Sequence, residues 1–221
     1  MSFQQQSYTI IKGAISKDTC RLLAREFRIA RDLAMKANYS NRQIKSEDCT
    51  NLNFPFHDEM VENSFSWYSP LCFEALSDTL IKDIVEKETQ TAVFPTYSYA
   101  RIYYTGAEML PHIDRSSSEI SVSLCVDVDA NTDSWNLFVK DKNSNIIEVV
   151  QEPGDIIIYK GHELAHWRNI YSGNEQINAF MFYVNATGPR SELKYDTREL
   201  LGEGPKLRKL NSEEQYKKFC C

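Results

Sequence analysis

Two histidines and an aspartate stand at spacings that suit metal binding. His112 and Asp114 are separated by a single residue, and in an extended segment residues i and i+2 point to the same side. His166 follows 54 residues later, just after an apolar run and a turn. Two antiparallel strands can bring such positions together. Two histidines and one carboxylate, with three positions left open for a co-substrate and O₂, form the facial ligand set of non-haem iron(II).

Each histidine has a plainer interpretation when it is taken alone. His112 could be a polar residue at a sheet edge, and His162 and His166 could be surface residues in a turn. The joint placement of these residues at strand ends favours a metal site. A metal-dependent hydrolase could use the same two histidines and aspartate, and it would need a general base near the metal.

Short β-branched and aromatic runs dominate the chain after residue 92 and predict the strands that position these residues. They are TYSYARIYY, EISVSLCVDV, WNLFVKD, IIEVVQ, DIIIYK and QINAFMFYV. Many short strands separated by turn residues indicate a sandwich or a jelly roll.

The first 90 residues predict helical support. YTIIKGAIS predicts a short strand and a turn, and Ser16 is expected to cap a helix over residues 17–37 with apolar residues at helical spacing (Leu22, Leu23, Phe27, Ile29, Leu33 and Ala34). Residues 38–68 predict a long loop that could act as a lid. Ser69 and Pro70 predict the start of a second helix that runs through residue 88.

Composition indicates one ordinary globular domain over residues 1–221, an α+β fold that is mainly β. We expect helical support over about 1–90, a core over about 91–188 and a charged tail over 189–221.

The net charge of −6 disfavours a nucleic-acid partner. We expect no signal peptide, no membrane span and a cytoplasmic location with reduced thiols. Cys220 and Cys221 could form a redox or metal-binding tail.

Residues 6–185 resemble the 2-oxoglutarate- and iron(II)-dependent oxygenases, specifically the prolyl-4-hydroxylase-like branch. The resemblance rests on YTIIKGAISKDTCRLL, on Y-x-x-G-x-x-x-x-P-H-x-D at 103–114, on EPGDIIIYKGHELAHW and on QINAFMFYV. It implies a double-stranded β-helix, or jelly roll. It also implies iron(II), 2-oxoglutarate and O₂, with ascorbate as an accessory reductant.

The same resemblance assigns roles to individual residues. It makes His112, Asp114 and His166 the metal ligands and catalytic residues, and Tyr103 a hydrogen-bond donor to the distal carboxylate of 2-oxoglutarate. His166 stands at the family's usual distance before QINAFMFYV, whereas His162 is four residues too early. The implied reaction hydroxylates an unactivated C–H bond, of a prolyl residue in a protein or of a free amino acid, and releases succinate and CO₂.

One position departs from the family. An Arg or Lys usually follows the distal histidine by about ten residues and pairs with the far carboxylate of 2-oxoglutarate; here that residue is Gln176. Arg168 and Arg101 are equal candidates to replace it, Arg115 ranks third, and Gln176 could still donate a hydrogen bond. The missing basic residue also supports an alternative, a non-catalytic jelly-roll binding protein that has lost its co-substrate.

Alternation along residues 119–128 predicts two faces. Ser121, Ser123 and Cys125 share the small polar face, which suits a barrel interior that holds a ligand or else a solvent-exposed surface. Trp167 could border the substrate entrance, although packing is the more common role of tryptophan. The tyrosine cluster is expected in the core (Tyr97, Tyr99, Tyr103 and Tyr104). The sequence leaves the oligomeric state open.

Overall fold

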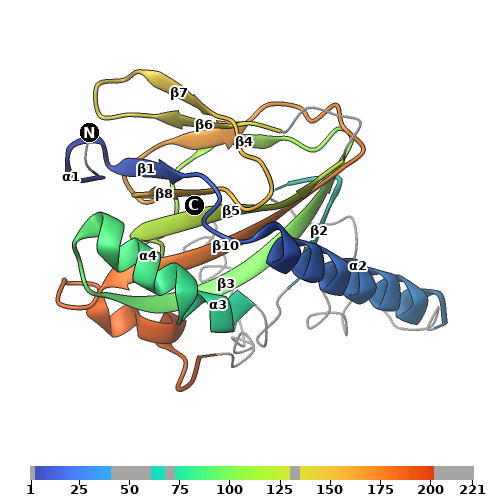
Figure 1. The fold of residues 1–221 in the computed structure, drawn as a ribbon, viewed down its shortest axis with the longest axis horizontal. Coiled ribbons are helices and arrows are strands. Elements are labelled where there is room, and N and C mark those ends of the chain that lie inside the picture. Colours follow the sequence, from blue (N-terminus) through green and yellow to red (C-terminus); the bar gives the residue numbers. More distant parts are fainter. Residues whose placement is uncertain (1–2, 41–60, 68–72, 130–134, 202–221) are drawn as a thin grey trace, which may run out of the picture.

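Two antiparallel sheets face each other in the computed structural model, which describes residues 3–40, 61–67, 73–129 and 135–201. Within these residues a six-stranded sheet has the order β1-β8-β5-β10-β3-β2 and a four-stranded sheet the order β4-β9-β6-β7. In Figure 1 the four-stranded sheet lies above the larger one. The larger sheet consists of β1 (Tyr8–Ile11), β8 (Ile156–Tyr159), β5 (Ile120–Val128), β10 (Glu175–Asn185), β3 (Val93–Tyr104) and β2 (Ser64–Trp67). The smaller consists of β4 (Met109–His112), β9 (His166–Arg168), β6 (Leu137–Lys140) and β7 (Ile146–Val149).

Helices cover the outer face of the larger sheet (Figure 1). They are α1 (Phe3–Gln6), α2 (Lys17–Ser40), α3 (Ala75–Ser77) and α4 (Leu80–Thr89), and a 3-10 segment, η3 (Ser191–Thr197), follows β10. As predicted, Ser16 caps α2, because its Oγ accepts the Thr19 backbone N–H at 3.1 Å. Leu23 and Phe27 of α2 are buried against the sheet.

Three details of the helical half differ from the sequence prediction. Leu22, Ile29 and Leu33 of α2 are exposed, because only one stripe of the helix faces the sheet. Within the predicted loop over residues 38–68, residues 64–67 form β2, which pairs with β3. Residues 41–60 and 68 of that predicted loop lie outside the described residues, and so does any lid formed there.

The second predicted helix is interrupted. Its start at Ser69 and Pro70 lies outside the described residues, and the helical part that follows is divided into α3 and α4. Thr79 has non-helical dihedral angles and donates its hydroxyl to the Ala75 carbonyl at 2.6 Å. This side-chain hydrogen bond competes with the helical pattern and accounts for the break.

The strand β5 separates two interiors. Ile120, Val122, Leu124 and Val126 face the helices and join the larger hydrophobic core. The alternate residues Ser121, Ser123 and Cys125 are also buried, on the face turned toward the smaller sheet. The interpretation of this small polar face as a barrel interior is therefore correct, and the solvent-facing alternative is wrong.

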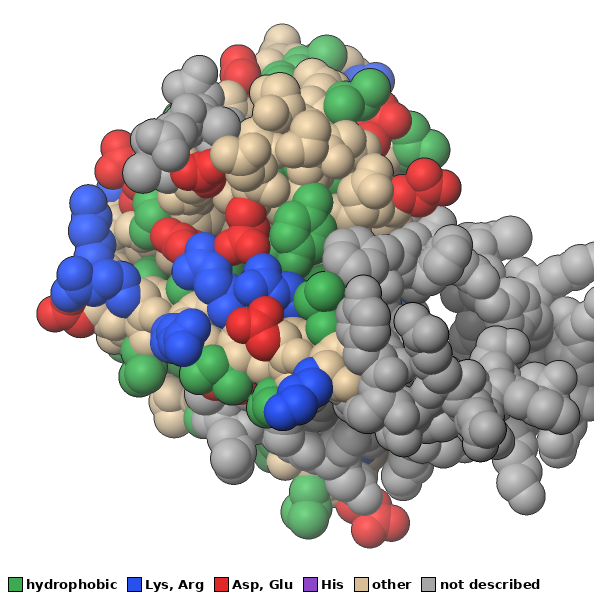
Figure 2. Space-filling view, turned by 90° about the vertical axis from the view of Figure 1, so that its right-hand side faces the viewer, with side chains coloured by type: hydrophobic (Ala, Val, Ile, Leu, Met, Phe, Trp, Pro, Cys, Tyr) green, Lys and Arg blue, Asp and Glu red, His purple; other side chains and the backbone are tan. Residues whose placement is uncertain are grey.

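Ion pairs join helix α2 to the larger sheet. Basic and acidic side chains interleave on the face shown in Figure 2. Arg28 of α2 binds Asp127 at 2.6 Å and Glu175 at 2.7 Å, and Arg31 binds Glu175 at 2.7 Å. These contacts join α2 to the ends of β5 and β10.

Cys20 and Cys125 are buried free thiols, whereas Cys220 and Cys221 lie outside the described residues. In the described part of the chain, no helix has both the length and the apolar character needed to cross a bilayer.

Candidate metal centre

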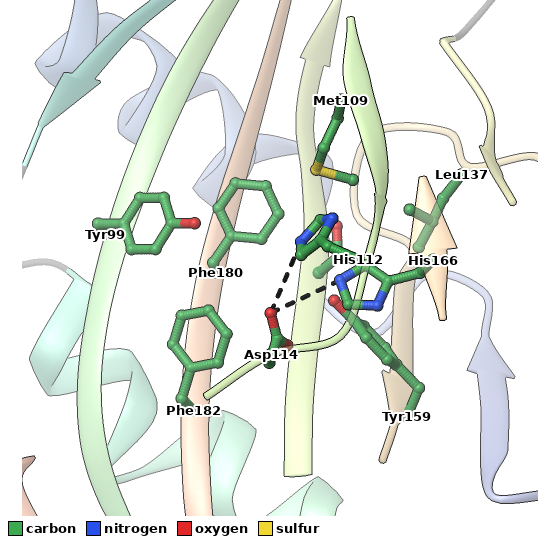
Figure 3. Close-up of a pocket in the computed structure, with 10 residues that line it drawn as sticks. Tyr99, Met109, His112, Asp114, Leu137, Tyr159, His166, Phe180 and Phe182 are labelled. Carbon is green, nitrogen blue, oxygen red and sulfur yellow. Dashed lines mark ion pairs between the residues drawn. The ribbon is translucent and has the colours of Figure 1, made fainter. Parts of the chain in front are cut away.

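His112, Asp114 and His166 come together between the two sheets. One ligand atom from each lies within 4.8 Å of the others. Asp114 Oδ1 is 3.8 Å from His112 Nε2 and 3.6 Å from His166 Nε2, and Figure 3 shows both rings directed at the carboxylate. Two ligands at right angles, each about 2.1 Å from a metal ion, would be about 3 Å apart. A small inward movement of these side chains would therefore complete a facial set of three ligands.

Strand pairing brings the two histidines together. His112 at the end of β4 is the register partner of His166 at the start of β9. The other ring nitrogen of each histidine is engaged locally: Nδ1 of His112 lies 2.8 Å from the Leu110 carbonyl, and Nδ1 of His166 lies 3.0 Å from the Leu164 carbonyl. These bonds fix the tautomer that leaves Nε2 free to bind a metal.

Burial sets the protonation state of His166. It lowers the pKa of His166 below its ordinary value, and the neighbouring Asp114 carboxylate opposes this shift. A neutral imidazole has a lone pair on Nε2, whereas a protonated ring has none to offer a metal. His166 is thus held in the form that a metal ligand requires.

His112, Asp114 and His166 line a pocket between the sheets. Its lining is mostly apolar and aromatic: Tyr99, Met109, Leu137, Tyr159, Phe180 and Phe182 join the three ligands and Ser123. In Figure 3 Tyr99, Phe180 and Phe182 lie across the pocket from the histidines. The edge of the Tyr159 ring meets the His166 ring, with 4.8 Å between their centroids. Such a pocket suits an organic ligand held next to a metal ion.

Arg168 is a buried cation without a counter-ion in the described part of the chain. It is only 1% exposed, and neither its Nε nor its Nη2 has a hydrogen-bond partner among the described residues. Its Nη1 donates to the Trp135 carbonyl, and its guanidinium lies over the Trp135 ring at 5.3 Å. Burial lowers the pKa of Arg168. A buried, incompletely paired guanidinium is costly to the fold, and a bound anion would compensate it.

Arg101, which the sequence ranked equally with Arg168 as the carboxylate anchor, contacts Ser66 and two tyrosine rings instead. Its Nε donates to Ser66 Oγ at 2.8 Å, and its guanidinium lies 5.5 Å from the Tyr99 ring centre and 5.9 Å from that of Tyr103. Arg101 and Tyr103 therefore share one face of β3, as predicted. Tyr103 is fully buried, and its ring meets Trp135 edge-on at 4.7 Å, which places it in the surroundings of Arg168.

Gln176 uses its amide within the protein. Its Oε1 accepts the Trp135 backbone N–H at 2.6 Å, and its Nε2 donates to Asn178 Oδ1 at 2.8 Å. The same Nε2 lies 3.4 Å from the Trp135 carbonyl. Gln176 and Arg168 therefore both contact the backbone of Trp135.

The other residues singled out from the sequence lie outside the ligand set. His162 Nδ1 is 3.1 Å from the Glu119 carbonyl, and His162 is not among the residues whose ligand atoms converge. Arg115 stacks on the Tyr97 ring at 4.1 Å and binds Asp196 at 3.0 Å. Trp167 stacks on Phe138 at 5.7 Å and is not among the residues that line the pocket.

Several residues that shape the pocket were not expected from the sequence. Tyr159, Phe180 and Phe182 lie within predicted strands and line the pocket, but alternation alone does not reveal which sheet closes over which. Trp135, which contacts Gln176 and Arg168, joins the same hydrophobic cluster as Phe180 and Phe182. No sequence signal distinguishes such a residue from ordinary core.

Solved structures with the same fold include prolyl hydroxylases and a protein solved with 2-oxoglutarate bound. A prolyl-4-hydroxylase from Pseudomonas putida shares 15% identity over 83% of this chain and 95% of its own, with a TM-score of 0.59. HygX from Streptomyces hygroscopicus, solved with nickel, 2-oxoglutarate and hygromycin B, shares 10% identity over 84% of this chain and 85% of its own, with a TM-score of 0.59. A collagen prolyl hydroxylase of Paramecium bursaria Chlorella virus-1, in complex with 2-oxoglutarate, shares 12% identity over 81% of this chain and 97% of its own, with a TM-score of 0.54.

No family model and no curated protein matches the sequence. The predicted fold, a mainly β jelly roll with supporting helices, is confirmed by the two opposed sheets and by these neighbours. At these identities the likeness establishes the fold. The chemistry is argued from the residues that this chain places between its sheets.

Proposed function

We propose that this protein is an iron(II)- and 2-oxoglutarate-dependent dioxygenase. The observation that carries the proposal is the presence, in one jelly-roll interior, of the facial ligand set and an incompletely paired buried guanidinium. A metal-binding triad alone would serve many reactions. The buried Arg168 guanidinium indicates that the molecule bound to the metal carries a negative charge at its far end, as 2-oxoglutarate does.

His112, Asp114 and His166 would hold the metal. Their donor set, two imidazoles and one carboxylate, suits iron(II) and leaves positions open on the pocket side. When bound, iron(II), 2-oxoglutarate and O₂ supply the oxidising power for hydroxylation of an unactivated C–H bond, with succinate and CO₂ as co-products. The protein contributes geometry and an aromatic pocket that limits the access of water.

Arg168 would bind the distal carboxylate of 2-oxoglutarate. Its free Nε and Nη2 form one edge of the guanidinium, which is the geometry that binds a carboxylate through two hydrogen bonds. Tyr103 would contribute its phenol to the same carboxylate from β3. In this arrangement Arg168 would replace the basic residue that is missing at position 176. The alternative of a binding protein without a co-substrate is thereby weakened.

The substrate is proposed at the level of class. The structural neighbours include prolyl hydroxylases and a protein solved with bound hygromycin B. We propose hydroxylation of a prolyl residue in a protein or of a free amino acid. The aromatic wall formed by Tyr99, Phe180 and Phe182 supports a substrate with an apolar ring or side chain.

Anaerobic titration with iron(II) and 2-oxoglutarate tests this function. The wild type should develop the weak visible absorption band of the iron–2-oxoglutarate chelate and, with O₂, convert 2-oxoglutarate into succinate. His166→Ala should abolish the band, whereas the control His162→Ala should retain it, because His162 is not one of the three residues whose ligand atoms converge. Bound iron without a band in the wild type would exclude 2-oxoglutarate and favour a binding protein or a hydrolase.

A further inference from the structure

Asp114 is held by two neighbours that are not metal ligands, one at its carboxylate and one at its backbone. Ser121 Oγ donates a hydrogen bond to Asp114 Oδ2 at 2.7 Å. The Asp114 backbone N–H donates to the Gly161 carbonyl at 2.8 Å. The other carboxylate oxygen, Oδ1, is the one that faces both histidines (Figure 3). The two oxygens of Asp114 therefore have different surroundings.

Ser121 is a rigid donor for this bond. It is completely buried on β5, between the register partners Phe182 on β10 and Tyr159 on β8. Its hydroxyl has a second acceptor within reach, the Ser118 carbonyl, but at 3.4 Å. Since a hydroxyl carries one proton, the shorter distance assigns it to Asp114.

Gly161 provides the space that the carboxylate occupies. A Cβ atom at position 161 would lie 2.1 Å from Asp114 Oδ2 and 2.1 Å from Ser121 Oγ. The φ of Gly161 is not in the left-handed region, so other residues could adopt its backbone conformation. Space, rather than backbone freedom, thus requires glycine here. The atoms that a methyl group would displace are the ends of the Asp114 and Ser121 side chains.

We propose that Ser121 and Gly161 are positioning residues that make Asp114 a one-oxygen metal ligand. Ser121 occupies Oδ2, and Gly161 allows the carboxylate to rotate until Oδ1 alone faces the two Nε2 atoms. A carboxylate that bound through both oxygens would occupy one of the positions that a co-substrate needs. The inference rests on the proposed metal site and adds the residues that set its open positions.

Titration of the apo protein with Mn²⁺ alone, without co-substrate, tests the role of Ser121. Ser121→Ala should weaken Mn²⁺ binding about tenfold or more, as is typical when a residue that orients a metal ligand is removed. Ser98→Ala is the matched control, because Ser98 is a buried serine on β3 whose hydroxyl has no partner among the described residues.

Gly161→Ala provides a second test with a spectroscopic readout. The methyl group should displace the Asp114 carboxylate, so that Mn²⁺ affinity falls further than in Ser121→Ala and the visible spectrum of bound Co²⁺ changes shape. Unchanged affinity and an unchanged Co²⁺ spectrum in both variants would overturn the inference, and so would an equal loss of affinity in Ser98→Ala. A wild type that binds neither ion would overturn the proposed function together with it.

Discussion

Arg168 lies two residues after His166 on β9, and both side chains enter the space between the sheets. They are 1% and 2% exposed, whereas Trp167 between them stacks on Phe138 outside the pocket. One short strand therefore presents a proposed metal ligand and a buried cation on the same face. A molecule that chelates a metal at one end and carries a carboxylate at the other would contact both.

Arg168→Gln should weaken the binding of 2-oxoglutarate to the metal-loaded protein by about 10- to 100-fold, because hydrogen bonds to a charged group contribute about 1.5–3 kcal/mol. Binding of the metal alone should not change. Anaerobic titration of the visible band measures the effect. Arg101→Gln is the control and should have little influence, since Arg101 donates to Ser66. A larger loss in the control than in Arg168→Gln would move the anchor to Arg101.

Ser123→Ala should weaken 2-oxoglutarate binding about three- to tenfold, because a hydrogen bond of about 0.5–1.5 kcal/mol is lost. Among the ten residues that line the pocket, Ser123 is the one with a buried polar atom that lacks a partner in the described residues. Ser123 lies between Ser121 and Cys125 on the same face of β5. The effect should disappear with 2-oxobutanoate, which lacks a distal carboxylate. An equal loss with both acids would place the hydroxyl at the chelating end.

The strands of the jelly roll could be predicted because alternation is a local property. The polar face of β5 was evident from Ser121, Ser123 and Cys125, and the spacing of His112 and Asp114 indicated a shared direction. The short strands β4 and β9 were not predicted. Each has too few residues to show a period, and pairing between distant segments creates them.

The choice of anchor could not be made from the sequence either. Arg101 and Arg168 both lie two residues from a proposed site residue. They differ only in what surrounds the guanidinium: Ser66 accepts a hydrogen bond from Arg101, and the Trp135 carbonyl accepts one from Arg168. Ser66 and Trp135 are remote in sequence from the arginines they contact. A site that depends on such contacts becomes visible only when the chain is folded.

Moving the cation from Arg168 to position 176 should restore part of the lost binding. Arg168 Nη1 and Gln176 Nε2 both approach the Trp135 carbonyl, so the two side chains end in the same place. The double variant Arg168→Gln/Gln176→Arg should bind 2-oxoglutarate more tightly than Arg168→Gln alone. Gln176→Arg alone should lower the melting temperature, because two cations would then be buried together. Failure of the double variant to recover any binding would show that the carboxylate does not lie within reach of both positions.

Acid should remove a contribution to stability that Asp155 makes beside β8. Burial alone would raise the pKa of Asp155, but hydrogen bonds from Lys12 and from the backbone N–H groups of Glu152 and Gly13 outweigh it and lower the pKa. A depressed pKa contributes stability above the unfolded value of about 3.9, and that stability is lost as pH falls through the folded value. Asp155→Asn should therefore reduce the free energy of unfolding by about 1–3 kcal/mol at pH 7 and by much less at an acidic pH that lies below the lowered folded pKa. Lys12→Ala should cost at most about 1 kcal/mol, because the Lys12 side chain is largely exposed. Denaturant unfolding at the two pH values measures both variants, and an Asp155→Asn effect that is equally large in acid would contradict the assignment.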